Sequence, residues 1–308
     1  MGLLTTNKKL CPICGSPTSR ILSTRVENRL LCKTCASKID LPDGTLDAMS
    51  LDSFRRYLAF YDENQALRDQ FCPTYRHDFS FLGGSLLLDF ENRLLRLKDD
   101  DTALVLQADM LETFRILEDG RVVFAREDST LMCYQSTVPA RLAALAPQVA
   151  QFNAQRQEFA WRENMTRMQL DYASKNGESL SPDAYDLQPH FTAPAPLQKF
   201  QVTLSLQHPY WRMVRWEVDA PRLDANYPNI NAYQQDYEAK VDALHTLASR
   251  LMQLVCPGAR EVYTAASHSD AEERQLLRDC KAFSDAIFLA KLDLSGKKLQ
   301  RLSLSYDI

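Results

Sequence analysis

The sequence has no long apolar run and no leader-like start. In its 308 residues, no stretch approaches the roughly 18 consecutive apolar residues that a membrane-spanning helix needs. Residues 1–9 lack the apolar core of a secretory signal peptide. Together with cysteine pairs that suit a reducing compartment, these absences predict a cytoplasmic protein without a transmembrane segment.

Familiar catalytic motifs are also missing. The chain has nine glycines and contains no P-loop, no GxGxxG and no GxSxG, so we expect neither a phosphate-cradling loop nor a serine nucleophile elbow. None of the histidines is spaced from a second metal ligand as in HExxH; they are His77, His190, His208, His245 and His268. We therefore expect no enzyme and no small-molecule cofactor, although an activity without a recognised motif stays open.

Two CxxC pairs near the N-terminus are the most informative feature that is present. Cys11-Pro-Ile-Cys14 and Cys32-Lys-Thr-Cys35 are separated by 17 residues, which is typical of a four-cysteine zinc site, and Gly15 suits a tight turn after the first pair. We expect these four cysteines to bind one structural Zn²⁺ per chain in a closed site that cannot activate water. Two disulfides or unrelated thiols are the alternative. The remaining cysteines are expected to be core or surface thiols: Cys72, Cys133, Cys256 and Cys280.

Charge is distributed unevenly along the chain. The formal net charge is −4, which argues against a surface built wholly for nucleic acid. Residues 1–40 nevertheless carry seven basic and two acidic side chains, an excess of five that falls to three when four thiolates and one Zn²⁺ are included. Nucleic-acid binding by this segment is therefore an alternative function, and its candidate residues are Arg20, Arg25, Arg29 and Lys33.

Residues 41–135 predict a helix followed by short strands. Ser50 can cap a helix that ends before Pro73 and whose apolar face holds Leu51, Phe54, Tyr57, Leu58 and Tyr61. Between 78 and 135, apolar runs separated by turn residues predict an antiparallel meander or small barrel, with a hairpin at Glu118-Asp119-Gly120. The acidic residues 99–101 are expected to form a solvated loop rather than a metal site.

Residues 136–308 predict long helices and further strands. A helix towards Tyr172 has near-heptad apolar spacing that Arg156 interrupts, so we expect it to pack on the chain's own sheet rather than form a free coiled coil. His208-Pro-Tyr-Trp211 is expected to form a corner in which His208 bonds locally. The other predicted elements are a mobile Pro-rich loop at 176–196, strands at 200–206 and 213–218, a helix at 227–257, a helix after Ser269 and a terminal strand at 299–306.

These patterns predict an α+β protein with an N-terminal appendage. Its expected parts are a zinc ribbon at 1–40, a connecting helix at 41–75, an antiparallel sheet with a long helix at 76–175, the Pro-rich loop at 176–196, and a strand pair with C-terminal helices at 197–308 packed on the same sheet.

The order of these parts resembles a family of uncharacterised bacterial proteins with a domain of unknown function. The similar motifs are the CxxCG and CxxC pairs, Phe71-Cys-Pro-Thr, Asp89-Phe-Glu-Asn-Arg-Leu94, Phe114-Arg-Ile-Leu-Glu-Asp-Gly120, His208-Pro-Tyr-Trp211 and the helix start at Tyr227. The resemblance spans most of residues 10–255. It implies a zinc ribbon followed by a pleckstrin-homology-like sheet or barrel, and it implies no activity.

The sequence therefore favours a non-catalytic zinc-binding scaffold whose partner is another protein or a second copy of the chain. Nucleic-acid binding through the ribbon is the first alternative. Peripheral lipid binding through the pleckstrin-homology-like sheet is the second, although residues 78–135 are short of the clustered Lys and Arg that anionic lipid requires.

Overall fold

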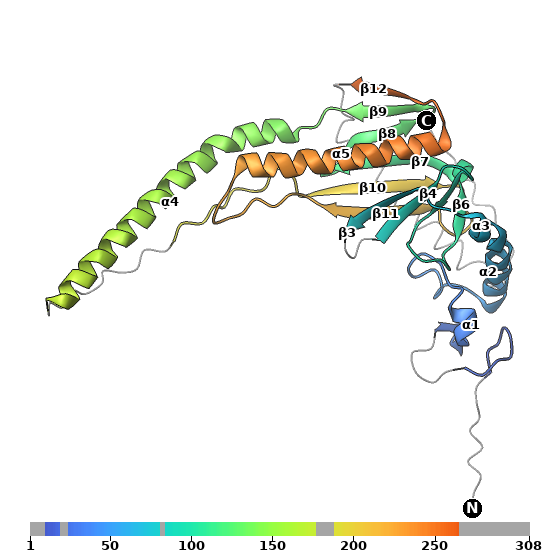
Figure 1. Cartoon of the computed structure of the whole chain (residues 1–308). Coiled ribbons are helices and arrows are strands. Elements are labelled where there is room, and N and C mark those ends of the chain that lie inside the picture. The colour runs from blue at the N-terminus through green and yellow to red at the C-terminus, as the bar shows by residue number, and fades with distance from the viewer. Residues whose placement is uncertain (1–9, 19–23, 81–83, 177–187, 265–308) are drawn as a thin grey trace, which may run out of the picture.

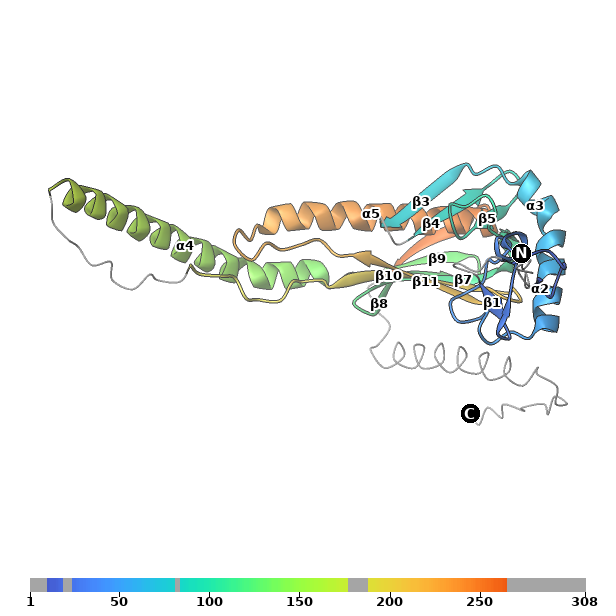
Figure 2. The same cartoon turned by 90° about the horizontal axis from the view of Figure 1, so that it is seen from below.

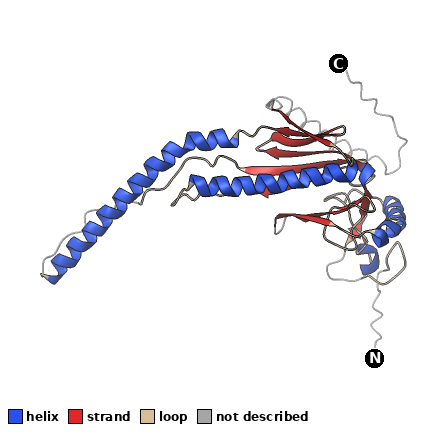
Figure 3. Cartoon of the chain, turned by 45° about the horizontal axis from the view of Figure 1, so that its top comes forward, coloured by secondary structure: helices blue, strands red, loops and turns tan. Residues whose placement is uncertain are grey.

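A computed structural model describes residues 10–18, 24–80, 84–176 and 188–264 (Figure 1). They form a mixed α+β body with a small N-terminal ribbon at one end and one long helix that projects from the other (Figures 1 and 3). The helix predicted after Ser269 and the strand predicted at 299–306 lie outside the described residues.

The N-terminal ribbon is built on a two-residue hairpin. Strands β1 (Arg25–Val26) and β2 (Arg29–Leu30) pair in antiparallel fashion, and Glu27 and Asn28 take positive φ values of 47° and 59° in the turn between them. The short helix α1 (Lys33–Ala36) follows directly. The hairpin thus returns the chain so that the second CxxC pair lies beside the first.

The predicted connecting helix is two helices that meet at a buried asparagine. α2 (Leu51–Glu63) is capped by the Ser50 hydroxyl, and α3 (Gln65–Gln70) begins after Asn64. The Asn64 side chain donates to the carbonyl of Val105 (2.7 Å) and accepts from the Val105 N–H (3.0 Å). The amide thus forms the two hydrogen bonds with β6 that the backbone of a neighbouring strand would otherwise form. The predicted apolar face is confirmed, because Phe54, Tyr57, Leu58 and Tyr61 are buried.

Two larger sheets form the body. The four-stranded sheet has the order β3-β4-β5-β6, and the six-stranded sheet has the order β11-β10-β7-β8-β9-β12. The strands are β3 (Tyr75–Ser80), β4 (Gly84–Asp89), β5 (Leu94–Arg96), β6 (Val105–Gln107), β7 (Leu111–Glu118), β8 (Arg121–Glu127), β9 (Thr130–Tyr134), β10 (Lys199–Leu206), β11 (Met213–Asp219) and β12 (Arg260–Thr264); a 3₁₀ turn, η1 (Ala108–Met110), precedes β7. The predicted hairpin at Asp119-Gly120 joins β7 to β8.

One expectation about the sheet is corrected and one is confirmed. The described strands do not close into a barrel, because β10 pairs with the edge of β7 and extends the second sheet to β11. The two sheets meet instead where Phe79 of β3 stacks on Trp216 of β11, with ring centroids 4.3 Å apart. The antiparallel pairing predicted for residues 78–135 is confirmed for all pairs among β3–β9, and β12, which was not predicted, adds one parallel pair at β9.

Helix α5 (Ile230–Val255) covers the six-stranded sheet and reaches the four-stranded one (Figure 1). Asn229 caps it by accepting from the N–H of Ala232 at 3.1 Å. Its buried face confirms the predicted spacing at most positions and comprises Tyr233, Tyr237, Leu244, Leu247, Ala248, Leu251, Met252 and Leu254. Packing within the chain therefore accounts for the apolar seam of this helix.

Helix α4 (Val138–Lys175) meets the described body along its first half, and in its second half Ala173 alone is buried. Its buried positions there run from Val138 to Phe152, where it meets α5 and the phenyl ring of Phe191. Beyond this point it extends past both sheets (Figures 2 and 3). The prediction that this helix packs on the chain's own sheet is therefore wrong for its second half.

A buried carboxylate connects the ribbon to the body. The Asp40 side chain is 9% exposed and accepts from the Lys98 ammonium (2.7 Å) and the Leu104 N–H (2.8 Å). The Asp40 N–H donates to the Tyr57 hydroxyl (2.6 Å), and its carbonyl accepts from the Trp211 indole (3.1 Å). One residue thus contacts α2, the four-stranded sheet and the corner before β11.

We predict that Asp40→Ala lowers the free energy of unfolding by about 3 kcal/mol, because it leaves the Leu104 N–H buried without its acceptor and removes the partner of Lys98. Urea unfolding measures the effect. Asp43→Ala, at an exposed position nearby, is the control and should change stability by less than about 0.5 kcal/mol. Equal effects of the two substitutions would contradict the role given to Asp40.

The corner at 208–211 predicts a dependence of stability on pH. His208 is 3% exposed, and its Nδ1 accepts from the N–H groups of Tyr210 (3.3 Å) and Trp211 (2.9 Å), as the local bonding predicted from sequence requires. Its Nε2 is buried and has no hydrogen-bond partner among the described residues. Burial lowers the pKa of His208 from 6.5 to about 4, so the folded state holds the neutral ring.

Because the unfolded chain binds this proton more readily, stability should fall as pH drops from about 6.5 towards 4, by at most about 3 kcal/mol from His208. His208→Asn retains an acceptor for the two N–H groups and does not titrate, so its stability should decline less over the same interval. Chemical unfolding of both proteins at several pH values measures the difference. Parallel pH profiles would rule out this role of His208.

Candidate metal centre

The first CxxC pair is held by a tight backbone turn. The Cys11 N–H donates to the Ser16 carbonyl (2.8 Å), and the Gly15 N–H donates to the Cys11 carbonyl (2.9 Å). Gly15 has a φ of 72°, a left-handed conformation that glycine adopts without strain. This turn brings Cys11 and Cys14 to the same side of the chain.

The second pair is placed by a helix start. Cys32 is the N-cap of α1, and its sulfur accepts from the Cys35 N–H at 3.4 Å. The Ala36 N–H donates to the Cys32 carbonyl (2.9 Å), which completes the turn. Both thiols therefore lie at the N-terminal end of α1.

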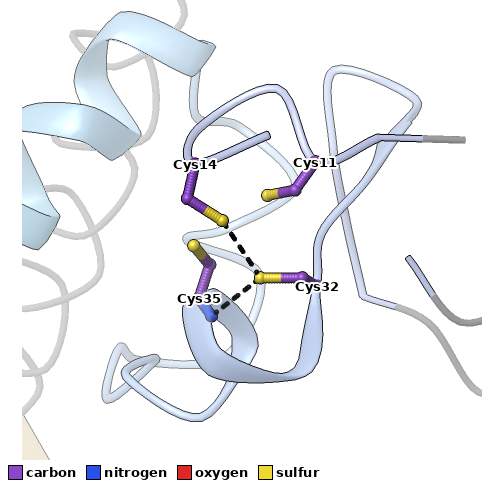
Figure 4. A group of neighbouring side chains, drawn as sticks. All are labelled: Cys11, Cys14, Cys32 and Cys35. Atoms are coloured by element: carbon purple, nitrogen blue, oxygen red, sulfur yellow. Dashed lines mark hydrogen bonds between the residues drawn. The ribbon is translucent and has the colours of Figure 1, made fainter. Parts of the chain in front are cut away.

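The four sulfurs converge on one point (Figure 4). All lie within 4.8 Å of one another, and those of Cys14 and Cys32 are 3.4 Å apart. Tetrahedral Zn²⁺ with Zn–S bonds of about 2.3 Å holds its sulfurs roughly 3.8 Å apart, so the cluster could hold one metal ion such as zinc. Every cysteine in the described part of the chain is a free thiol, contrary to the disulfide alternative.

The thiols differ in environment. Cys11, Cys32 and Cys35 are buried, whereas Cys14 is exposed. Hydrogen bonds from Ser16 lower the pKa of Cys14 to about 6, while burial raises the pKa of Cys35, helped by the neighbouring sulfur of Cys32. Without a cation Cys35 would therefore retain its proton, and binding of a metal would release it.

The ribbon shares its core with α2 rather than forming a detached module. Cys11, Val26 and Leu31 are buried in the same apolar cluster as Phe54 and Tyr57. A further bond runs from the Arg55 guanidinium to the Pro12 carbonyl (3.1 Å). A metal ion at the four cysteines would thus order one end of the main core.

Two of the candidate nucleic-acid residues, Arg25 and Arg29, lie on different faces of the hairpin. Arg25, Arg29 and Lys33 are exposed, and Arg20 lies outside the described residues. Arg25 is paired with Leu30 and Arg29 with Val26. Because paired residues share a face and successive residues alternate, the two arginines stand on opposite faces of the hairpin.

Two groups that sequence reasoning missed flank the sheet edge near α5. Cys133, His245 and Glu261 come from β9, α5 and β12, with donor atoms within 4.8 Å of one another. The buried Glu118 carboxylate accepts from Tyr237 (2.6 Å) and Ser136 (2.5 Å), and burial raises its pKa. No fixed sequence spacing connects either group, so only the tertiary structure reveals them.

Comparisons with known proteins add no relative. The chain matches no family model, no curated protein and no solved structure. Within the described residues, no helix combines the length and hydropathy that crossing a bilayer requires. The fold and the four-cysteine cluster therefore stand on the chain's own geometry.

We predict that the purified protein retains one Zn²⁺ per chain after dialysis against a weak chelator, and that Cys32→Ser loses it. Amide hydrogen exchange should then accelerate within residues 10–36 and change little in β7 and β8. Cys72→Ser, at an exposed thiol outside the cluster, should retain the metal. A metal-free wild-type protein whose ribbon is equally protected from exchange would contradict the assignment.

Proposed function

We propose that the protein is a non-catalytic interaction protein in which a structural Zn²⁺ orders the ribbon and α4 is the docking arm. The observation that carries the proposal is the solvent-exposed half of α4. Trp161, Met165, Met168 and Tyr172 are 64%, 40%, 66% and 70% exposed there. Large apolar side chains that are grouped and exposed mark interaction surfaces.

These four residues form one stripe, which we call the arm stripe. They are spaced by four, three and four residues, the spacing of a coiled-coil seam. At 100° per residue the arm stripe lies about 170° round α4 from the buried positions Leu145 and Phe152. The helix therefore presents one apolar face to its own body and the reverse face, further along, to a partner.

The arm stripe is self-complementary in an antiparallel arrangement. With two helices centred midway between positions 165 and 168, Trp161 of one copy lies opposite Tyr172 of the other, and Met165 lies opposite Met168. An aromatic pair then forms each end and two sulfur-containing pairs form the middle. Each layer contains side chains of similar size, as seam packing requires.

Charge complementarity selects the same arrangement. Glu158 lies three residues before the arm stripe and Lys175 three residues after it, and both side chains are exposed. An antiparallel pair places Glu158 of one copy opposite Lys175 of the other, whereas a parallel in-register pair would oppose like charges. We therefore take the occupant of the arm stripe to be a second copy of this chain.

The remaining features are compatible with a scaffold. The body holds a four-stranded and a six-stranded sheet with α5 packed on them, which is a rigid support for a docking arm. A four-thiolate zinc site is coordinatively closed and serves structure rather than catalysis. Nucleic-acid and lipid binding rank lower, because Arg25 and Arg29 diverge and the 78–135 segment is poor in clustered basic residues.

Sedimentation equilibrium tests the proposal through a charge exchange. The wild type should dimerise, Glu158→Lys should weaken the dimer at least about tenfold by opposing two lysines, and Glu158→Lys with Lys175→Glu should restore it. Met168→Glu should also weaken it by placing a charge in the seam. Glu163→Lys, on the face away from the arm stripe, is the matched control.

Two results would reject this function for α4. The wild type could remain monomeric at all concentrations tested, or Met168→Glu could dimerise as tightly as the control. Failure of the double charge exchange to restore association would reject the antiparallel register.

A further inference from the structure

Three potential metal ligands of different chemistry meet between α5 and the β9–β12 edge of the larger sheet. The Cys133 thiol, the His245 imidazole and a Glu261 carboxylate oxygen all lie within 4.8 Å of one another. They stand apart from the four-cysteine ribbon: β9 and β12 lie side by side at the edge of the larger sheet, and α5 packs against β9 (Figure 1).

The sheet register explains why they meet. β12 pairs with β9 so that Glu261 is opposite Leu131 and Tyr263 is opposite Cys133. Paired residues share a face, so Cys133 and Glu261 both point to the side of the buried Leu131. That side faces α5, which contributes His245.

Glu261 is held in place from several sides. One oxygen accepts from the Ser249 hydroxyl (2.9 Å), and the other lies 3.2 Å from both the Tyr263 hydroxyl and His245 Nε2. The Phe124 ring contacts the imidazole, with centroids 5.3 Å apart. Such orientation of ligands by neighbouring groups is characteristic of metal sites.

The donor set fits a divalent transition-metal ion. A thiolate, an imidazole and a carboxylate are the ligands that Zn²⁺ and Co²⁺ accept in tetrahedral sites, with donor atoms roughly 3.4–3.8 Å apart. His245 Nε2 and the nearer Glu261 oxygen are 3.2 Å apart, slightly closer than that range, and the Cys133 sulfur lies within 4.8 Å of both, so small side-chain adjustments would complete the geometry.

Three protein ligands leave the fourth coordination position of a tetrahedral metal ion free. A cavity next to the cluster gives an external ligand access to that position. Its volume is about 540 Å³, and two of the three ligands, Cys133 and His245, line it together with Glu118, Ser136 and Asp242, while Glu261 lies outside the lining. Water or a small oxygen- or nitrogen-donor ligand can reach the metal from this space. This distinguishes the cluster from the closed site of the ribbon.

The thiol supplies a measurable signature. Cys133 is 3% exposed, and an ordinary cysteine thiol, with a pKa of about 8.5, keeps its proton at neutral pH. A bound cation favours the thiolate strongly, so the metal replaces the thiol proton and one H⁺ is released to solvent.

We infer that Cys133, His245 and Glu261 form a second metal site, which binds one divalent transition-metal ion and leaves its fourth coordination position open to the cavity. The inference is independent of the docking role of α4, since the arm stripe contributes none of these residues.

The test uses the full chain with its ribbon already loaded with Zn²⁺, to which Co²⁺ alone is added. One equivalent of Co²⁺ should bind per chain, with visible d–d absorption typical of tetrahedral coordination and release of one proton. His245→Ala should weaken Co²⁺ binding at least about tenfold, and Cys133→Ser should abolish the proton release.

Asp242→Asn is the matched control, because Asp242 lines the same cavity on the same helix and is outside the cluster. It should bind Co²⁺ as the wild type does. No absorption from the wild type would show that His245 and Glu261 form only an ion pair. Equal binding by His245→Ala would likewise overturn the second site.

Discussion

The buried carboxylate of Asp40 is the constraint on which the arrangement of this protein depends. Asp40 is the last residue of the ribbon segment. Its carboxylate accepts hydrogen bonds from the Lys98 ammonium and the Leu104 N–H, and its backbone forms hydrogen bonds with the side chains of Tyr57 and Trp211. A buried carboxylate is stable only when such partners are all present. The ribbon, α2, the four-stranded sheet and the corner before β11 are therefore fixed together, and the four-cysteine cluster becomes one end of a continuous core.

The second half of α4 contrasts with this closely connected body. Helices in proteins gain most of their stability from packing one apolar face, and Trp161 and Met168 lie on a face that nothing in the described chain covers. An antiparallel second copy would supply the missing contact and would set two bodies at opposite ends of a shared arm. The four-cysteine ribbon, at the end of the body opposite the arm, would remain open to other partners (Figure 1).

Local signals in the sequence predicted local structure well. Three such signals were enough to predict the local structure, because each depends on residues close together in the sequence. They are the spacing of the cysteines from Cys11 to Cys35, the helix cap at Ser50 and the turn at Asp119-Gly120. Non-local pairing could not be predicted from the sequence. The pairing of β12 with β9, the pairing of β10 with β7 and the convergence of Cys133 with His245 all depend on the assembled sheet. Asp40 carried no sequence signal, since its partners are distant in the chain, and the free half of α4 has the same apolar spacing as a packed helix.

Disulfide trapping tests the antiparallel arm most directly. Chains carrying Met165→Cys and chains carrying Met168→Cys, each also with Cys72→Ser to remove an exposed thiol, are tagged differently, mixed and oxidised gently. The account predicts mixed dimers joined between positions 165 and 168 in preference to dimers of either chain alone. Homodimers of each variant would indicate a parallel pair, and the absence of any cross-link would contradict self-association through α4.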